Sequence, residues 1–160
     1  MIIIVIYFYK YSIGKIGIAE ENGKITNLYF ENTEFPKDIL MCETPILKEA
    51  ARQLNDYLTG KLKEFSLPLE PAGTDFMKQV WKSLCKIPYG KTVSYKCIAE
   101  KIGNPKAARA VGLANNRNPI PVFIPCHRVV GINGALTGYI GGLELKRKLL
   151  DIEKIKLLIF

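Results

Sequence analysis

Three hydrophobic stretches open the chain, at residues 2–9, 13–19 and 25–30, and each is rich in β-branched and aromatic residues. This composition is typical of β-strands. Asn22-Gly23 lies between the second and third stretches, and this dipeptide between two strands favours a two-residue hairpin turn. The pattern therefore predicts three strands, with the last two joined as a hairpin.

The hydrophobic period then changes to that of a helix. Thr44 suits the N-cap and Pro45 the first helical position, and Gly60 marks the end. The apolar residues of this segment fall on one helical face: Ile46, Leu47, Ala50, Leu54 and Leu58. A short strand at 65–69 and a linker at 71–73 complete a first part that contains no obvious catalytic residue.

From residue 74 the pattern predicts helices. Thr74-Asp75 begins a helix whose apolar stripe faces the core and which ends by residues 88–90, and Ser94 caps a short helix over 95–102. A Gly-Asn-Pro turn leads into a further helix over 106–116, in which small residues such as Ala107 and Ala108 allow close approach to a surface. Two short helices joined in this way outline a helix-turn-helix. A helical hairpin packed inside the protein has the same pattern.

The last part combines a strand, a loop and a helix. The apolar run 120–124 predicts a strand that Pro125 ends, and five glycines lie between residues 131 and 142. A final helix runs from residue 143 to about 151–153, and a tail at 155–160 docks on the body. In this helix, the leucines are predicted to face inward: Leu145, Leu149 and Leu150. Its basic residues are predicted to face outward: Lys146, Arg147 and Lys148.

These elements predict an α/β (α+β) protein of two domains. Residues 1–71 form a small mixed sheet-plus-helix scaffold. Residues 72–160 form a mostly helical domain. With the helix-turn-helix interpretation of its two short helices, this domain is of the DNA-binding, winged-helix-like kind.

The charge of the chain is divided in the same way. Residues 1–71 hold 8 Lys and Arg against 10 Asp and Glu, a net charge of −2, whereas residues 72–160 hold 15 against 5, a net charge of +10. Such asymmetry favours a polyanionic partner, most often nucleic acid. Lysine-rich surfaces also keep proteins soluble, so charge alone leaves both interpretations open.

Several classes of protein do not fit the sequence. The longest apolar run, residues 2–9, is too short to span a bilayer and lacks the features of an export signal, so we expect no membrane association. The four cysteines show neither CxxC spacing nor a pattern suited to disulfides. We therefore expect no metal site, no cofactor and a reducing, cytoplasmic location.

The candidate chemistry lies at residues 125–130. The chain's single histidine, His127, follows Cys126 directly and precedes Arg128. A nearby base or cation activates a cysteine as a nucleophile, and the end of a strand is open to substrate. Taken alone, a free cysteine beside a histidine is more often an inert, small buried hydrophobic residue. Glu153, at the end of the last helix, opposes the helix dipole and so hints at a role beyond stability, although a solvated helix end also accounts for it.

Taken together, several sequence blocks closely resemble the O6-alkylguanine-DNA alkyltransferases. These proteins are methylated-DNA–protein-cysteine methyltransferases, which repair DNA by direct reversal. The resemblance covers about residues 74–153 and rests on the following blocks: Val93-Ser-Tyr95, Gly103-Asn-Pro-Lys-Ala-Ala-Arg-Ala-Val-Gly112, Arg117-Asn-Pro119, Pro125-Cys-His-Arg-Val-Val130 and Gly138-Tyr-Ile-Gly-Gly-Leu143, with Lys146 and Leu149-Leu150. The N-terminal half resembles the family only in length and in its strand-then-helix order.

The resemblance implies a role for each matching residue. Cys126 accepts the alkyl group from the O6 of guanine, His127 acts as its base through a water, and Glu153 orients His127. Tyr95 donates a proton to the departing base, and Asn118 braces the active-site turn. Arg109 fills the gap left in the duplex by the flipped nucleotide. The remaining residues contact the DNA or line the base pocket: Ala107, Ala108, Arg117, Val129, Tyr139, Ile140 and Lys146.

The resemblance also implies how the protein works. Its partner is double-stranded DNA containing O6-alkylguanine, with O4-alkylated thymine as a further candidate substrate. The base is flipped out through the minor groove, and the protein acts as a monomer. Because the thioether product is not reversed, each molecule acts once. Ile140 stands where vertebrate members often carry serine, so the shape of the pocket differs there.

Three other interpretations compete. A non-catalytic relative that only binds alkylated DNA lacks the cysteine that is present here. A cysteine hydrolase usually takes its cysteine and histidine from separate segments rather than from adjacent positions. A plain helix-turn-helix regulator leaves Cys126, His127 and Glu153 unexplained.

Overall fold

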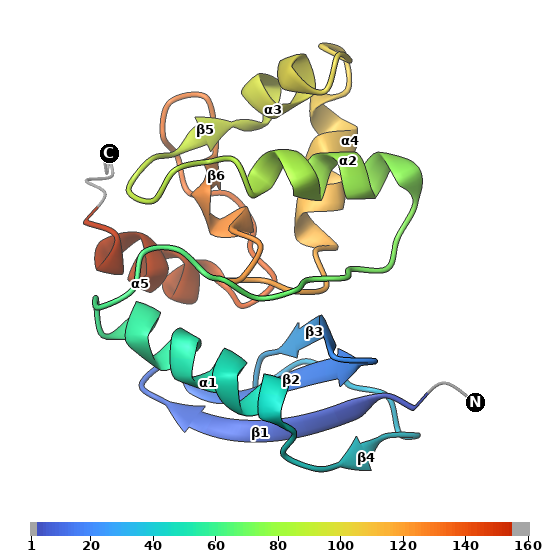
Figure 1. Cartoon of the computed structure of the whole chain (residues 1–160). Coiled ribbons are helices and arrows are strands. Elements are labelled where there is room, and N and C mark those ends of the chain that lie inside the picture. Colours follow the sequence, from blue (N-terminus) through green and yellow to red (C-terminus); the bar gives the residue numbers. More distant parts are fainter. Residues whose placement is uncertain (1–2, 155–160) are drawn as a thin grey trace. The chain divides into compact units, whose positions relative to one another are not determined.

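The computed structural model describes residues 3–154 of the chain. The chain folds into two compact units that divide between residues 72 and 73, within the segment interpreted as a linker (Figure 1). The N-terminal unit is a sheet with one helix, and the C-terminal unit is mostly helical.

The sheet of the N-terminal unit has the strand order β3-β2-β1-β4. Antiparallel pairing joins β1 (Val5–Tyr11) to β2 (Gly14–Glu21) and β2 to β3 (Lys24–Tyr29). The edge strand β4 (Leu40–Met41) pairs with β1 in parallel. With two residues, β4 is too short to leave an alternating pattern in the sequence, so it was not predicted.

The predicted hairpin between β2 and β3 is confirmed. Asn22 and Gly23 form its turn with φ angles of 52° and 78°. Both angles lie in the left-handed region that a type I′ turn requires, which Asn and Gly adopt more readily than other residues.

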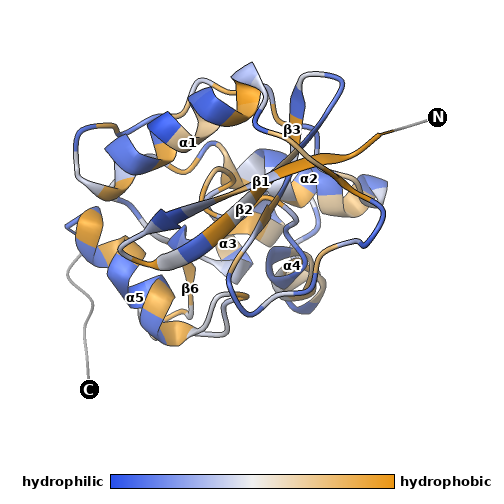
Figure 2. Ribbon diagram, turned by 90° about the horizontal axis from the view of Figure 1, so that it is seen from below, coloured by the Kyte–Doolittle hydropathy of each residue, from blue (hydrophilic) through white to orange (hydrophobic). Residues whose placement is uncertain are grey.

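Helix α1 (Pro45–Leu58) packs across the sheet (Figure 1). The Thr44 side chain accepts a hydrogen bond from the backbone N–H of Leu47, so the predicted cap is confirmed. Hydrophobic and hydrophilic residues alternate along the helix (Figure 2), and its core face buries Leu47, Ala50, Leu54 and Tyr57.

The strand predicted at 65–69 is wrong. Only Leu69 forms an isolated bridge, with Ile25. Pro68 has no N–H to donate to a ladder, so a regular strand cannot continue through it.

The C-terminal unit packs α2 (Asp75–Leu84), α3 (Tyr95–Lys101) and α4 (Ala108–Asn116) against one another. The side chains of Thr74 and Ser94 cap α2 and α3 as predicted, whereas α4 begins two residues later than predicted. The turn between α3 and α4 contains Gly103 with a φ of 81°. A last helix, α5 (Leu143–Ile152), and a short parallel pair, β5 (Val93–Ser94) with β6 (Val129–Val130), complete the unit.

The aromatic stripe of α2 is core, as predicted. Trp81 is 2% exposed, and its indole N–H donates a hydrogen bond to the Ala114 carbonyl of α4 over 2.9 Å. A Cβ at Gly73 would lie 2.5 Å from the Trp81 ring, so only glycine fits at the start of the unit. This packing holds α4 in a fixed position relative to α2 and α3.

The strand predicted at 120–124 is also wrong. The segment forms a buried tight turn in which Pro121 and Ile124 make an isolated bridge and Val122 has a φ of 75°. A continuous apolar run has no period that separates a buried strand from a buried turn. The left-handed conformation is rare for a β-branched residue, so composition pointed away from the observed turn.

The face of α5 was partly mispredicted. Lys146 is fully buried rather than outward, and its ammonium donates hydrogen bonds to the carbonyls of Val129, over 2.7 Å, and Thr137, over 3.2 Å. Leu145, predicted to face inward, is half-buried. The predicted docking of the tail 155–160 lies outside the described residues.

Within residues 3–154, no helix has both the length and the apolar character needed to cross a membrane.

Candidate active site

Cys126 lies on a short 3-10 turn, η1 (Cys126–Arg128), between the buried turn and β6. Two asparagines near the end of α4 hold this region. Asn118 accepts a hydrogen bond from the Ile120 N–H and donates one to the Ile124 carbonyl, each over 2.9 Å, and Asn115 donates to the Cys126 carbonyl over 3.3 Å. These bonds tie the turn to the helix-turn-helix.

The Cys126 side chain is 1% exposed, so the expectation that it sits at an open strand end is wrong. Burial raises the pKa of the thiol to about 11. Hydrogen bonds from Asn118 and Tyr139 and the positive charge of Lys146 act in the opposite direction, but they do not overcome burial. The thiol is therefore protonated at neutral pH and needs a base to become a nucleophile.

His127, Arg128 and Glu153 form a buried cluster, in which His127 and Arg128 directly follow Cys126 in the chain. His127 Nε2 lies 2.7 Å from Glu153 Oε2, and both side chains are fully buried. Arg128 pairs with the same carboxylate through Nε at 2.9 Å and Nη2 at 3.0 Å, and its Nη1 donates to the Ile87 carbonyl. Burial lowers the pKa of His127, and the charge of Arg128 lowers it further, while Glu153 raises it.

Glu153 occupies the C-cap of α5. The Gly90 N–H donates to its Oε1 over 3.0 Å, in addition to the contacts with His127 and Arg128. These partners satisfy a carboxylate that the helix dipole alone would disfavour. Arg128 therefore makes both an ion pair, with Glu153, and a structural hydrogen bond, to the Ile87 carbonyl.

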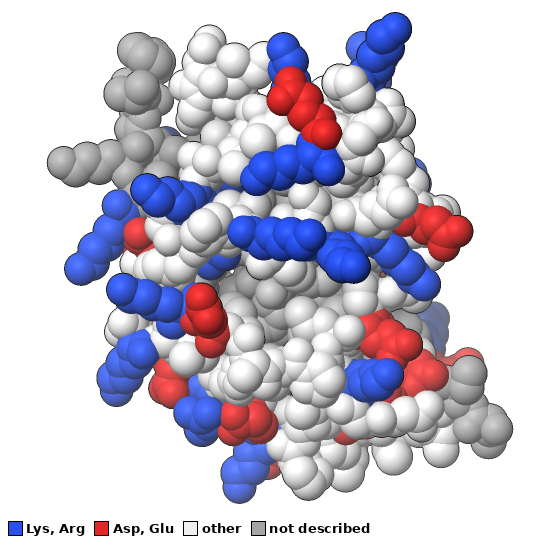
Figure 3. Space-filling model, turned by 45° about the horizontal axis from the view of Figure 1, so that its top comes forward, with Lys and Arg blue, Asp and Glu red and all other residues white. Residues whose placement is uncertain are grey.

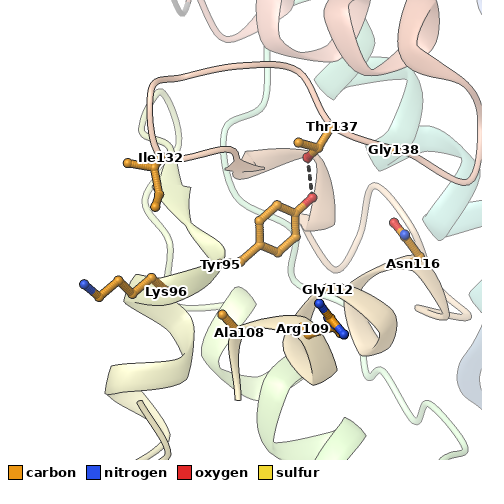
Figure 4. Close-up of a pocket in the computed structure, with 9 residues that line it drawn as sticks. All are labelled: Tyr95, Lys96, Ala108, Arg109, Gly112, Asn116, Ile132, Thr137 and Gly138. Atoms are coloured by element: carbon orange, nitrogen blue, oxygen red, sulfur yellow. Dashed lines mark hydrogen bonds between the residues drawn. The ribbon is translucent and has the colours of Figure 1, made fainter. Parts of the chain in front are cut away.

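An open pocket of about 430 Å³ lies on the same unit. Figure 4 shows Tyr95 at its centre, with its hydroxyl bonded to Thr137 and with Arg109 and Ala108 of α4 on one side. The other lining residues are Lys96, Gly112, Asn116, Ile132 and Gly138. Cys126 does not line the pocket. Burial raises the pKa of Tyr95, and the negative charge of the Cys126 thiolate raises it further when the thiolate forms.

The structure thus brings most of the candidate residues together around the thiol or the pocket. Val129 is fully buried and Tyr139 is 9% exposed, whereas Ile140 is 42% exposed. Ala107, Arg117 and Ile140 are not among the pocket residues. Sequence reasoning missed Thr137 and Ile132, and their position in a glycine-rich loop was the only available signal.

Basic side chains mark the outer face of the C-terminal unit. Figure 3 shows Lys and Arg side chains gathered over its helices, which carry the following exposed residues: Lys78 and Lys82 on α2, and Lys96 and Lys101 on α3. In the part of the chain that the structure describes, no group of three or more His, Cys, Asp or Glu side chains is placed to hold a metal ion.

Two family models match the chain. The DNA binding domain of 6-O-methylguanine DNA methyltransferase matches residues 75–155, and the ribonuclease-like domain of the same protein matches residues 4–71. The chain belongs to this methyltransferase family. The match to residues 4–71 also extends the relationship into the N-terminal half, where the sequence blocks alone had not carried it.

Individual members of the family are similar over most of their length. The methylated-DNA–protein-cysteine methyltransferase of Methanosarcina barkeri is 52% identical over 146 residues, which cover 89% of this chain and 92% of the relative. The constitutive enzyme of Bacillus subtilis is 48% identical over 156 residues, covering 89% and 91%. The crystal structure of Mycobacterium tuberculosis OGT in complex with DNA has a TM-score of 0.89 and 45% identity, covering 94% of this chain and 92% of that one.

Proposed function

We propose that this protein repairs alkylated DNA by transferring the alkyl group from O6 of guanine to the Sγ of Cys126. The observation that carries the proposal is the buried His127–Glu153 pair, whose histidine directly follows the buried Cys126, in a chain of the 6-O-methylguanine DNA methyltransferase family. O4-alkylated thymine is a second candidate substrate of the same chemistry.

The cluster supplies the base that the protonated thiol requires. In neutral His127, the Nε2–H donates to Glu153, so Nδ1 is the nitrogen that accepts the proton of Cys126, through a water. The thiolate then attacks the alkyl carbon in line with the C–O bond. The electron pair of that bond stays on guanine, and the hydroxyl of Tyr95 protonates the departing base.

The same unit provides the means of reaching a base inside the duplex. Arg109 is exposed on α4 at the rim of the pocket, where its side chain can fill the gap left by the extruded nucleotide. Ala107, Ala108 and Arg117 contact the DNA around it. Val129, Tyr139, Ile140 and Lys146 shape and hold the receiving pocket. The N-terminal unit serves as a scaffold.

The product is an alkylated cysteine that the proposed chemistry does not regenerate. Each molecule therefore acts only once. The proposed acting form is a monomer. The proposed location is the cytoplasm, where a reducing environment keeps the free thiol of Cys126 available.

The direct test is incubation with a duplex that carries one O6-methylguanine, followed by intact-protein and peptide mass measurement. We expect the mass of one methyl group on Cys126, at one equivalent per protein, and none in Cys126→Ser. Turnover beyond one equivalent would contradict the proposal, as would methylation of Cys85 or Cys97.

A further inference from the structure

Tyr95 and Thr137 join two segments that are distant in sequence. Their hydroxyl groups form a hydrogen bond in the wall of the pocket, in which either oxygen can be the donor (Figure 4). Tyr95 is the first residue of α3, whereas Thr137 belongs to the glycine-rich loop between β6 and α5. The bond therefore connects the helix-turn-helix to the loop that follows the cysteine.

Thr137 is held in place independently of this bond. Its carbonyl accepts a hydrogen bond from Lys146 over 3.2 Å, and the same ammonium binds the carbonyl of Val129. Its methyl group lies 3.6 Å from the position that a Cβ would take at Gly131. With the main chain and the methyl group both in contact, the hydroxyl is presented to Tyr95 in a set direction.

Tyr95 is fixed from the other side. The Ser94 side chain caps α3 by accepting from the Cys97 N–H over 3.0 Å, and the Tyr95 ring lies 3.7 Å from the position of a Cβ at Gly112. Neither contact depends on a bound base. The two hydroxyl groups are thus preorganised before substrate arrives, as efficient proton transfer requires.

We propose that Thr137 is a positioning residue for alkyl transfer, whose hydroxyl donates to the Tyr95 oxygen while Tyr95 gives its own proton to the departing guanine. This inference rests on the proposed function. The sulfur–carbon bond to Cys126 forms as the carbon–O6 bond breaks, and the electron pair of the broken bond goes to guanine. The Tyr95 O–H bond breaks as an N–H bond forms on the base.

The phenolate that results is where the Thr137 hydroxyl acts. A hydrogen bond to an ionised oxygen is stronger than one to a neutral oxygen, so the contact gains strength as the proton leaves. The proton first taken from the thiol by His127 restores neutral Tyr95, so charge balances. Burial raises the pKa of Tyr95, whereas the hydrogen bond with Thr137 lowers it. The lowering agrees with Thr137 as the donor, because a donated hydrogen bond stabilises the phenolate.

The test compares Thr137→Val, which keeps the shape of the side chain and removes the hydroxyl, with Thr137→Ser, which keeps the hydroxyl. The single-turnover rate of methyl transfer is measured with a saturating duplex that carries O6-methylguanine. The Kd for the same duplex is measured in a Cys126→Ser background. We expect Thr137→Val to slow transfer about tenfold or more with a Kd within about twofold of wild type, and Thr137→Ser to retain most of the rate.

A double-mutant cycle with Tyr95→Phe separates positioning from general structural damage. If Thr137 acts through the Tyr95 hydroxyl, Thr137→Val causes no further loss of rate in the Tyr95→Phe background. Equal losses in both backgrounds would overturn the inference, as would a weaker Kd that accounts for the whole effect or a Thr137→Ser variant as slow as Thr137→Val.

The wild-type protein distinguishes this inference from the function on which it rests. No methyl on wild-type Cys126 overturns both. Transfer by the wild type at the rate shown by Thr137→Val overturns the role of Thr137 alone.

Discussion

Arg128 and His127 share one carboxylate at the centre of the site. Arg128 binds both oxygens of Glu153, and His127 binds Oε2 from the other side. A buried anion with a permanent cation beside it remains ionised, and an ionised acceptor fixes the histidine tautomer. Arg128 thus contributes to the chemistry by holding Glu153, without contacting the thiol.

This arrangement predicts a large loss of stability on removing the charge of Glu153. In Glu153→Gln, the buried guanidinium of Arg128 loses its anion, and we expect the free energy of unfolding to fall by about 3 kcal/mol. Methyl transfer should slow in the same variant because the histidine is no longer oriented. Urea denaturation measures the first effect and single-turnover kinetics the second.

Glu144→Gln is the matched control, since Glu144 is exposed and its ion pair within residues 3–154 is a 3.9 Å contact with the exposed Lys148. Its stability should stay within about 0.5 kcal/mol of wild type. Equal losses in the two variants would show that burial of Glu153 has no energetic consequence.

The pH dependence of transfer follows from His127. Its pKa is lowered from the ordinary value of 6.5, because burial disfavours the charged ring. The folded protein therefore keeps the neutral, basic form as the pH falls through 6.5, whereas the unfolded chain takes up a proton there. We expect the single-turnover rate with saturating duplex to stay level down to pH 6.5 and to fall only below it. An acid limb with a midpoint above that value would contradict the assignment of His127 as base.

At the scale of the element, α3 and α4 carry Tyr95 and Arg109, the side chains that we propose act on the DNA. The Ser94 cap determines where α3 begins, and therefore where Tyr95 stands. Replacing an N-cap serine by alanine removes the acceptor for a helix N–H, so Ser94→Ala should cost about 1 kcal/mol of stability. It should also slow methyl transfer, because Tyr95 is the first residue of the helix.

Thr74→Ala tests whether the kinetic effect is specific. Thr74 caps α2 in the same way, by accepting from the Met77 N–H over 3.2 Å. The same loss of stability is expected there, with an unchanged rate of transfer. Slower transfer in both variants would instead point to a general effect of stability on activity.

Arg109 lies at the first turn of α4, and the role that we propose for it belongs to duplex DNA alone. Arg109→Ala should slow transfer from a duplex by about tenfold or more, because extrusion of a base costs a few kcal/mol. Reaction with free O6-benzylguanine needs no extrusion and should keep its rate. Arg147→Ala removes the same charge from an exposed position of α5 and serves as the control. Equal losses with both substrates in Arg109→Ala would refute the role in base extrusion.

At the scale of the whole molecule, charge separates the two halves of the chain. The net charge of +10 in residues 72–160 accompanies the helix-turn-helix, while residues 1–71 are slightly acidic. Neutralisation of phosphates by lysine and arginine releases counterions, which makes binding depend steeply on salt.

The logarithm of the association constant for undamaged duplex should therefore fall linearly with the logarithm of the salt concentration. The expected slope is about −0.9 for each phosphate neutralised. Fluorescence anisotropy measures this slope. The reaction with free O6-benzylguanine should be almost insensitive to salt over the same range. A flat salt dependence for duplex binding would show that the basic surface takes no part in it.

Short-range sequence patterns were sufficient to predict several local features of this fold. The Asn22-Gly23 hairpin, the caps at Thr44, Thr74 and Ser94, and the Trp81 core all follow from interactions within a few residues or from helical period. The adjacency of Cys126 and His127 was also visible in the sequence.

Only the tertiary structure decided the features that depend on distant residues. The helical period predicts that Lys146 faces outward, but the carbonyls of Val129 and Thr137 bind its ammonium inside the unit. The run 120–124 is a buried turn rather than a strand, and Cys126 is buried rather than open. The bond between Tyr95 and Thr137 joins residues 42 positions apart. Hydrogen bonds across such separations leave no local pattern, so the sequence by itself determined the candidate residues for the chemistry, and the fold decided how they are held.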